Sequence, residues 1–113
     1  MNGVQLIEQE RKRQIEVERH TIKGDAIHND GRQMAIAAIA YASFAIADPE
    51  TRKTVRNVTP FFWPGGWAIA SWKPSATDDN AGRIRELTKA GALIAAEIDR
   101  LLHVDNEGAE NAR

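Results

Sequence analysis

The chain has 113 residues, of which 42% are hydrophobic and 27% are charged. This length accommodates one domain with one hydrophobic core, and the composition is that of an ordinary globular protein, which argues against two domains and against extensive disorder. Fifteen Lys and Arg against sixteen Asp and Glu give a net charge of −1, so there is no strong signal for nucleic-acid binding or for a membrane surface. The absence of cysteine excludes disulfides, thiolate metal sites and a cysteine nucleophile.

The first segment with helical character runs from about Val4 to His20. Residues at helical spacing along one side alternate between apolar and charged types: Val4, Ile7, Arg11, Ile15, Glu18 and Ile22. Two interpretations of this mixed stripe are open. Arg11 and Glu18 lie at its border and extend to water, or they face a polar pocket between helices.

The longest apolar stretch, Met34 to Ala47, is rich in alanine and contains 14 residues. A bilayer span needs about 20 apolar residues, so we predict a core helix over about 31–47 rather than a membrane span. Its large side chains point to several sides, which predicts that the helix is buried all round. Asp30 lies in the predicted N-cap region, and Pro49 ends the helix because the residue before proline avoids the α conformation.

The third predicted helix extends from about Asn80 to His103. Large apolar residues and one glycine recur there at spacings of 3 and 4, the pattern of a helix-packing seam: Ile84, Leu87, Gly91, Ile94, Ile98 and Leu101. Gly91 lowers helix propensity but lets another backbone approach closely, so we predict a helix crossing there. Charged residues three or four apart predict a solvated polar face: Glu86 with Lys89, Glu97 with Arg100, and Asp99 with His103.

These elements predict an all-α fold with three principal helices. Residues 1–104 form a single helical domain, and residues 105–113 form a flexible tail because they have no apolar periodicity. Residues 49–79 hold all four prolines and all three tryptophans, so we expect a long loop folded over the helices, with a short helix allowed over 50–58. The apolar helix and the seam both need further cover, which predicts a symmetric homo-oligomer.

A metal-dependent reaction is one chemistry that the sequence allows. Two carboxylates and an imidazole lie within six residues, at Asp25, His28 and Asp30. The alternative is that these residues form a turn and cap a helix. Under the metal interpretation the candidate Mg²⁺ ligands are Glu16, Glu18, Asp25, His28 and Asp30. Glycine-rich phosphate loops and a nucleophile elbow are absent from the sequence.

Aromatic and basic residues gather in the long loop and indicate a second chemistry, the binding of a nucleotide. Indole rings can stack on a base at about 1–3 kcal/mol each, while neighbouring cations neutralise phosphate. The alternative is that the rings complete a small core, and the two roles are compatible. The candidate ligand-binding residues are Arg11, Glu18, Asp30, Arg52, Arg56, Trp63, Trp67, Trp72 and Lys73.

Several segments together resemble a widespread family of small phage and prophage proteins. They are ERKRQ at 10–14, DGRQMAIAAIAYA at 30–42, FWPGGW at 62–67, WKP at 72–74 and TKAGALIAAEIDRL at 88–101. The shared pattern is E-R-x-x-Q, an Ala-rich helix ending in Y-A, W-P followed by W-K-P, and K-A-G-A-L-I-x-A-E-I-x-R-L. The resemblance covers most of residues 8–103. It implies an all-α fold and a phage origin, and with them we expect a cytoplasmic location in an infected bacterial host.

The last helix is also similar to part of the MazG-type all-α nucleotide pyrophosphohydrolases. Those enzymes hold Mg²⁺ with an E-E-x-x-E helix and an E-x-x-D helix. Here the first helix has no such glutamate triplet, and Arg100 stands three residues after Glu97, where the pattern has aspartate. We therefore predict no catalytic residues and no resident cofactor, with Mg²⁺ required only under the enzyme interpretation.

Three functions are compatible with these features. The first is capture of a small phosphorylated nucleotide, cyclic or of ADP-ribose type, by which a phage protein removes a host defence signal. The second is metal-dependent hydrolysis of a nucleotide, and the third is inhibition of a host protein through an exposed aromatic loop. We favour the first, because cations and indoles are present while the carboxylate cage is incomplete.

Overall fold

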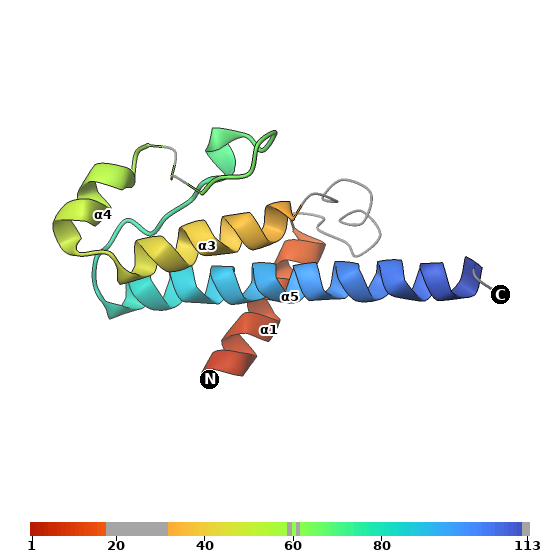
Figure 1. Cartoon of the computed structure of the whole chain (residues 1–113). Helices are drawn as coiled ribbons and strands as arrows, with labels where there is room; N and C mark the ends of the chain where they lie inside the picture. The colour runs from red at the N-terminus through yellow and green to blue at the C-terminus, as the bar shows by residue number, and fades with distance from the viewer. Residues whose placement is uncertain (18–31, 59, 61, 112–113) are drawn as a thin grey trace.

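A computed structural model describes residues 1–17, 32–58, 60 and 62–111. These residues form four α-helices and one 3₁₀ turn, with no strand among them: α1 (Gly3–Glu16), α3 (Gln33–Ile46), α4 (Pro49–Val55), η1 (Ile69–Ser71) and α5 (Asn80–Asn111). The predicted all-α class is confirmed, with α4 as a short helix beside the three principal ones (Figure 1). Within the described ranges, no helix has the length and apolar character needed to cross a bilayer.

Side-chain caps define where α1 and α4 begin. The Asn2 side chain accepts a hydrogen bond from the Gln5 backbone N–H (2.9 Å), and the Gln5 side chain accepts one from the Asn2 N–H (2.8 Å), which forms a capping box. Asp48 accepts from the Thr51 N–H at 2.9 Å and precedes Pro49 at the start of α4. The predicted helix end before Pro49 is confirmed, and the same residues start the next helix.

The observed bounds of α1 and α3 are tighter than the predicted ones. α1 ends at Glu16, and the predicted continuation as far as residue 20 lies largely outside the described residues. α3 begins at Gln33, and its N-cap is Arg32, which has a left-handed backbone conformation with φ of 71° and no side-chain cap. The N-cap is therefore not in the region predicted at Asp30.

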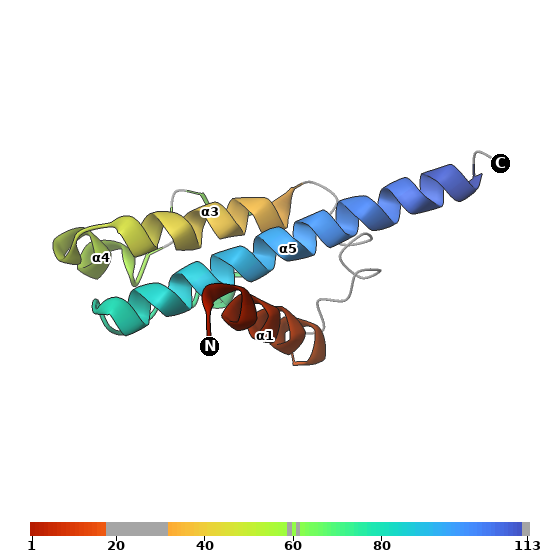
Figure 2. The same cartoon turned by 90° about the horizontal axis from the view of Figure 1, so that it is seen from below.

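α5 is longer than its apolar pattern. The predicted end at His103 is wrong, because the helix continues to Asn111 through the segment expected to be a tail. An established helix adds each residue through one more backbone hydrogen bond, so it extends without an apolar face. The side chains of His103 and Glu107, one turn apart, also approach to 3.2 Å. These last turns project beyond the other helices (Figures 1 and 2).

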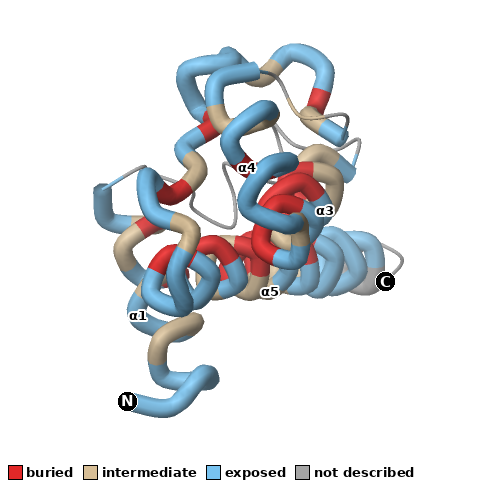
Figure 3. The backbone as a smooth tube through the Cα atoms, turned by 90° about the vertical axis from the view of Figure 1, so that its left-hand side faces the viewer, coloured by how far each residue is buried: buried red, intermediate tan, exposed pale blue. Residues whose placement is uncertain are grey.

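α3 and α5 lie side by side and antiparallel in both views, and this pair contains the core (Figures 1 and 2). The buried core residues of the pair are Met34, Ala37, Ala38, Ala40, Tyr41 and Phe44 on α3 and Ala90, Leu93 and Ala96 on α5. Most are small, so the two helices can approach closely. Figure 3 shows the buried residues concentrated where the two helices meet.

The inner face of α5 carries charges that we predicted to be solvated, and that prediction is wrong. Glu86, Glu97 and Arg100 are all buried. Glu86 pairs with Arg52 of α4, and Arg100 Nε lies 2.5 Å from Glu97 Oε1. Buried charges are tolerated when they are paired, and the alanines between them let α3 cover this face.

α1 meets α5 at Gly91, as predicted, but the atoms nearest to the glycine belong to a side chain and not to another backbone. A Cβ atom at this position would lie 2.6 Å from Cδ1 and 2.8 Å from Cγ1 of Ile7 in α1. One turn further along α1, Arg11 is buried and lies 3.4 Å from Asp99 of α5. Arg11 thus makes a polar contact between helices rather than extending to water, while Glu18 lies outside the described residues.

Replacing Gly91 with leucine is expected to lower the free energy of unfolding by about 1–3 kcal/mol, because the new side chain overpacks the crossing against Ile7. Shortening Ile7 to alanine in the same chain should recover part of the loss, since the two residues share one contact. Denaturant unfolding of the wild type, both single variants and the double variant measures the coupling. If the loss of stability in the double variant equals the sum of the two single losses, the contact between Gly91 and Ile7 does not determine how closely α1 packs on α5.

Large apolar residues remain at the surface of the single chain. The seam of α5 keeps between 45% and 52% of each large side chain exposed, at Ile84, Leu87, Ile94, Ile98 and Leu101. On α3, Ile39 is 46% exposed and Ile46 is 77% exposed. The expectation that α3 is buried all round is therefore wrong for one chain, because α5 and the loop between α4 and α5 cover only part of its circumference.

Candidate functional site

Arg52 anchors the loop that follows α4, and its side chain is almost fully buried. The guanidinium binds the Glu86 carboxylate of α5 in a bidentate arrangement, with N–O distances of 2.7 and 2.9 Å. It also donates to the Asp78 carboxylate and to the carbonyl oxygens of Phe44 and Thr77. All five N–H donors therefore have acceptors. One side chain thus joins α3, α4, α5 and the returning end of the loop.

Arg56, one turn after Arg52, completes this anchor. It donates to the Ser75 carbonyl oxygen at 2.8 Å and pairs with Asp78. Hydrogen bonds from Arg52, and then from Arg56, hold the pKa of Asp78 below its ordinary value of 3.8, so this carboxylate stays charged. Both arginines therefore hold the loop in place.

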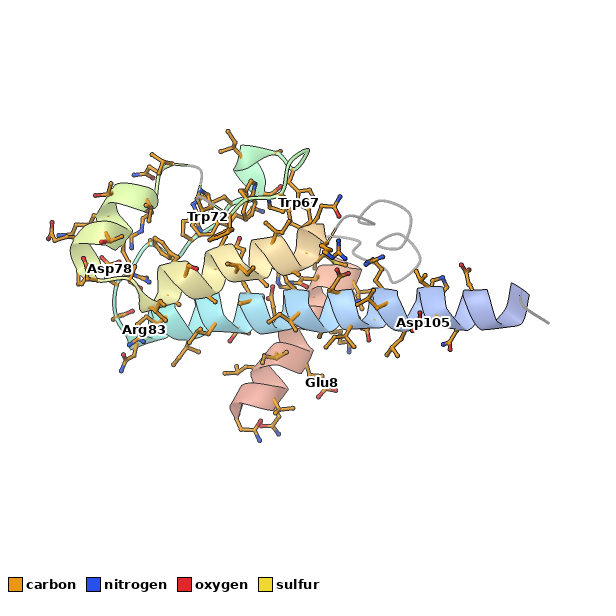
Figure 4. All side chains as sticks on the ribbon, in the orientation of Figure 1. Glu8, Trp67, Trp72, Asp78, Arg83 and Asp105 are labelled. Carbon is orange, nitrogen blue, oxygen red and sulfur yellow. The ribbon has the colours of Figure 1, made fainter. Side chains whose placement is uncertain are left out.

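The three tryptophans form a row from the core to the surface. Trp72 is buried, with its ring centre 4.8 Å from that of Tyr41 and 5.5 Å from that of Phe44. Trp63 lies 5.5 Å from Trp72, and Trp67 lies 5.8 Å from Trp63, both edge to face. Figure 4 shows Trp72 and Trp67 in the segment that passes over α3. Trp72 completes the core, whereas Trp63 and Trp67 are half-buried.

A cavity of about 410 Å³ lies beside the outer two tryptophans. It is lined by α1, α3, the loop and α5 through Glu10, Arg13, Gln14, Tyr41, Trp63, Trp67, Ser71, Lys73, Lys89 and Leu93. The Tyr41 hydroxyl holds the loop against α3 here, because it donates to the Ser71 carbonyl oxygen and accepts from the Lys73 N–H. The volume is that of a small-ligand pocket.

Positive charge predominates around the cavity. Arg13, Lys73 and Lys89 are accompanied by one carboxylate among the lining residues, Glu10. Two hydrogen bonds of 2.7 Å join Arg13 to Glu10. Lys89 Nζ lies 5.5 Å from the centre of the Tyr41 ring and 3.2 Å from the Lys73 carbonyl oxygen. With three cations and one acid, the cavity favours an anionic ligand.

Two buried polar atoms of the cavity-lining residues have no hydrogen-bond partner among the described residues: Oε1 of Gln14 and Nε1 of Trp63. Gln14 is 3% exposed, and its Nε2 donates to Glu10 at 3.3 Å. Buried polar groups normally have partners, because an unmade hydrogen bond costs about 1–3 kcal/mol. The described part of the chain therefore leaves one hydrogen-bond acceptor, on Gln14, and one donor, on Trp63, unsatisfied among the residues that line the cavity.

The residues predicted to bind ligand do not all converge. Trp63, Trp67 and Lys73 line the cavity. The others that the structure describes lie elsewhere: Arg52 and Arg56 in the loop anchor, Trp72 in the core and Arg11 beside Asp99. Glu18 and Asp30 lie outside the described residues.

Sequence reasoning missed most of the cavity lining. All lining residues except Ser71 lie in the five segments from which we expect a resemblance to small phage proteins. These segments are far apart in the chain, and the packing of α1 against α5 brings them to one place. Their convergence depends on the angle at which α1 crosses α5, and this angle cannot be predicted from the spacing of residues in the sequence.

The candidate metal site is not assembled in the described part of the chain. Glu16 is exposed and lies 4.0 Å from Lys12, while Glu18, Asp25, His28 and Asp30 lie outside the described residues. Among the residues that the structure describes, no group of three His, Asp or Glu side chains is placed to hold an ion.

The ion pair at Glu10 predicts a pH dependence of stability. Burial alone would raise the pKa of Glu10, but the hydrogen bonds and charge of Arg13, with Gln14 and Lys89, outweigh it and hold this pKa below its ordinary value of 4.5. A carboxyl with a lowered folded pKa stabilises the fold above its unfolded pKa, and this contribution is lost as the pH falls through the folded pKa. We expect wild-type stability to fall more steeply than that of Glu10→Gln on acidification below pH 4.5. Urea unfolding at several pH values in this range gives the dependence of stability on pH for both proteins. Equal dependences would contradict the prediction.

No protein-family model, curated protein sequence or solved structure matches the chain.

Proposed function

We propose that the protein binds a small phosphorylated nucleotide in the cavity between α1, the loop and α5. One observation supports the proposal above all: two half-buried indoles, Trp63 and Trp67, and three cations line the same cavity. A base stacked on an aromatic ring gains about 1–3 kcal/mol, and charge-assisted hydrogen bonds from Lys or Arg hold phosphate. A ligand with a base and a phosphate can make both contacts at once.

The unsatisfied atoms of Gln14 and Trp63 complement such a ligand. The edge of a nucleobase carries hydrogen-bond donors and acceptors side by side, which match an amide oxygen and an indole N–H. Both protein atoms are covered by neighbouring groups, so a ligand would reach them after a side-chain rotation. Binding would then supply the two hydrogen bonds that the described residues do not make.

We propose that the nucleotide is held without being transformed, and that the protein is a phage product that removes a host defence signal in the cytoplasm of an infected bacterium. One observation favours capture over hydrolysis: the cavity has more cations than carboxylates, so its lining suits an anion better than a catalytic metal ion. We propose the phage origin and the infected host only from the resemblance of the five segments to small phage proteins.

One incubation tests capture against hydrolysis. Purified protein is mixed with ADP, ADP-ribose and cyclic mono- and dinucleotides, with and without Mg²⁺, then filtered, heat-denatured and analysed by chromatography of both fractions. A nucleotide that is retained by the protein and released intact supports capture. Metal-dependent loss of the parent compound would establish hydrolysis instead, and free passage of every nucleotide would contradict the proposal.

Replacing Trp67 with alanine is expected to weaken binding of the retained nucleotide roughly tenfold to a hundredfold, because a stacking surface is lost. Trp67→Phe keeps an aromatic face and should retain most of the affinity. Ile69→Ala is the matched control, since Ile69 is 64% exposed in the same loop and does not line the cavity. Calorimetric titration measures all three. Unchanged affinity in Trp67→Ala would exclude this ring from the site.

A further inference from the structure

The seam of α5 carries five half-exposed apolar side chains, and Ile7 of α1 covers Gly91 in its middle. α3 covers a different side of the helix, the one that carries Ala90, Leu93 and Ala96, and α1 crosses at Gly91. Figure 3, which looks along α5, shows α1 and α3 on different sides of it. The seam residues project from the remaining side, each about half exposed: Ile84, Leu87, Ile94, Ile98 and Leu101. Monomeric proteins rarely expose a contiguous row of this kind, and such rows mark interfaces.

The row is complementary to itself. Its residues are separated by 3, 4, 3, 4 and 3 positions, a series that is the same in both directions along the helix. A two-fold axis midway between Gly91 and Ile94 therefore pairs every member with another. It sets Ile84 against Leu101 and Leu87 against Ile98 of the second copy. The position opposite Ile94 is Gly91, whose surface is covered by the half-buried side chain of Ile7 from α1, so Ile94 of the second copy would meet Ile7 there.

Charge selects the antiparallel arrangement. Most charges of α5 lie off this face, because Glu86, Glu97 and Arg100 are buried in ion pairs and Lys89 lines the cavity. Arg83, whose Nε also donates to the Ala45 carbonyl oxygen, and Asp105 are exposed and flank the apolar row, a cation near its start and an acid near its end. Antiparallel pairing brings exposed Arg83 within about one turn of exposed Asp105 of the second copy, once at each end. A parallel pair would place like charges together.

We propose that the protein forms a homodimer in which the α5 helices of two copies pack antiparallel through this face, with Leu87 of one against Ile98 of the other. The pairing removes five half-exposed side chains per copy from water, which is the main favourable contribution to association. It leaves the nucleotide cavity on another side of α5, so it does not depend on the proposed function. Dimer formation would bury the apolar seam residues that a single chain leaves half exposed.

The chain contains no cysteine, so single introduced cysteines report the register directly. In the proposed dimer, Leu87→Cys and Ile98→Cys should form a disulfide with each other when the two variants are mixed under mild oxidation. Neither should cross-link alone, because each position is displaced by about 16 Å along the axis from its own copy. Peptide mapping identifies the linked residues. Cross-linking of each variant with itself would establish a parallel pair and overturn the proposal.

Sedimentation of the unmodified chain and of charge variants provides an independent test. The wild type should sediment as a dimer, and Ile98→Lys should raise the dissociation constant roughly a hundredfold or more, because a charge would be buried in the interface. Ile69→Lys is the control, since Ile69 is more exposed than Ile98 and lies outside the seam. A monomeric wild type, or equal effects of the two lysine variants, would contradict the proposal.

Discussion

Replacing Arg52 with methionine is expected to lower the free energy of unfolding by about 3–5 kcal/mol, a large share of the stability of a small domain. The change leaves the carboxylate of Glu86 at 0% exposure without its charge partner. The Glu86 carboxylate then keeps the hydrogen bond from the Ser75 backbone N–H, at 3.1 Å. The carbonyl oxygens of Phe44 and Thr77 lose a donor as well.

Urea unfolding followed by circular dichroism measures this loss. Arg52→Met combined with Glu86→Leu should recover most of it, because a buried ion pair replaced by apolar residues of similar size is often no less stable. Lys53→Met is the matched control: the neighbouring residue on α4 has a 64% exposed side chain, and its loss should change stability by about 0.5 kcal/mol or less. Equal effects of Arg52→Met and Lys53→Met would show that the loop anchor does not stabilise the fold.

Truncating Trp72 to alanine is expected to cost about 3–5 kcal/mol. The ring packs against Tyr41, Phe44 and Trp63, and the neighbours can only partly fill the space that its removal leaves. Trp67→Ala should cost less stability, because Trp67 is half-buried at the outer end of the same row. Thermal unfolding of both variants, with Trp72→Phe as an intermediate change, measures the order. A loss in Trp72→Ala no larger than in Trp67→Ala would contradict the assignment of Trp72 to the core.

Local signals in the sequence predicted where the principal helices lie. The alanine-rich run and Pro49 located α3, and the residue spacing with Gly91 located α5 and a crossing on it, which the structure assigns to α1. The inner face of α5 was predicted wrongly, because the large apolar residues indicated a packing face while the structure buries alanines and paired charges. Small residues that face each other allow two helices to pack closely. The periodicity of large apolar residues does not reveal such a face.

The candidate site was predicted only in part, for a related reason. Trp63, Trp67 and Lys73 could be found because aromatic and basic residues are concentrated in one loop. Glu10 and Gln14 line the cavity one turn apart on α1, yet nothing near them in sequence indicates the loop residues opposite. Arg52 was predicted as a phosphate ligand from its charge alone, whereas its partner Glu86 lies 34 positions away.

The row of tryptophans would also let the protein report the nucleotide binding that we propose. Trp72, Trp63 and Trp67 follow one another at ring separations of 5.5 and 5.8 Å, close enough for excitation of one indole to pass to the next. A base stacked on Trp67 would then quench emission that originates at Trp72, which is buried and does not line the cavity. The fluorescence of the whole chain should therefore respond to the occupation of one cavity.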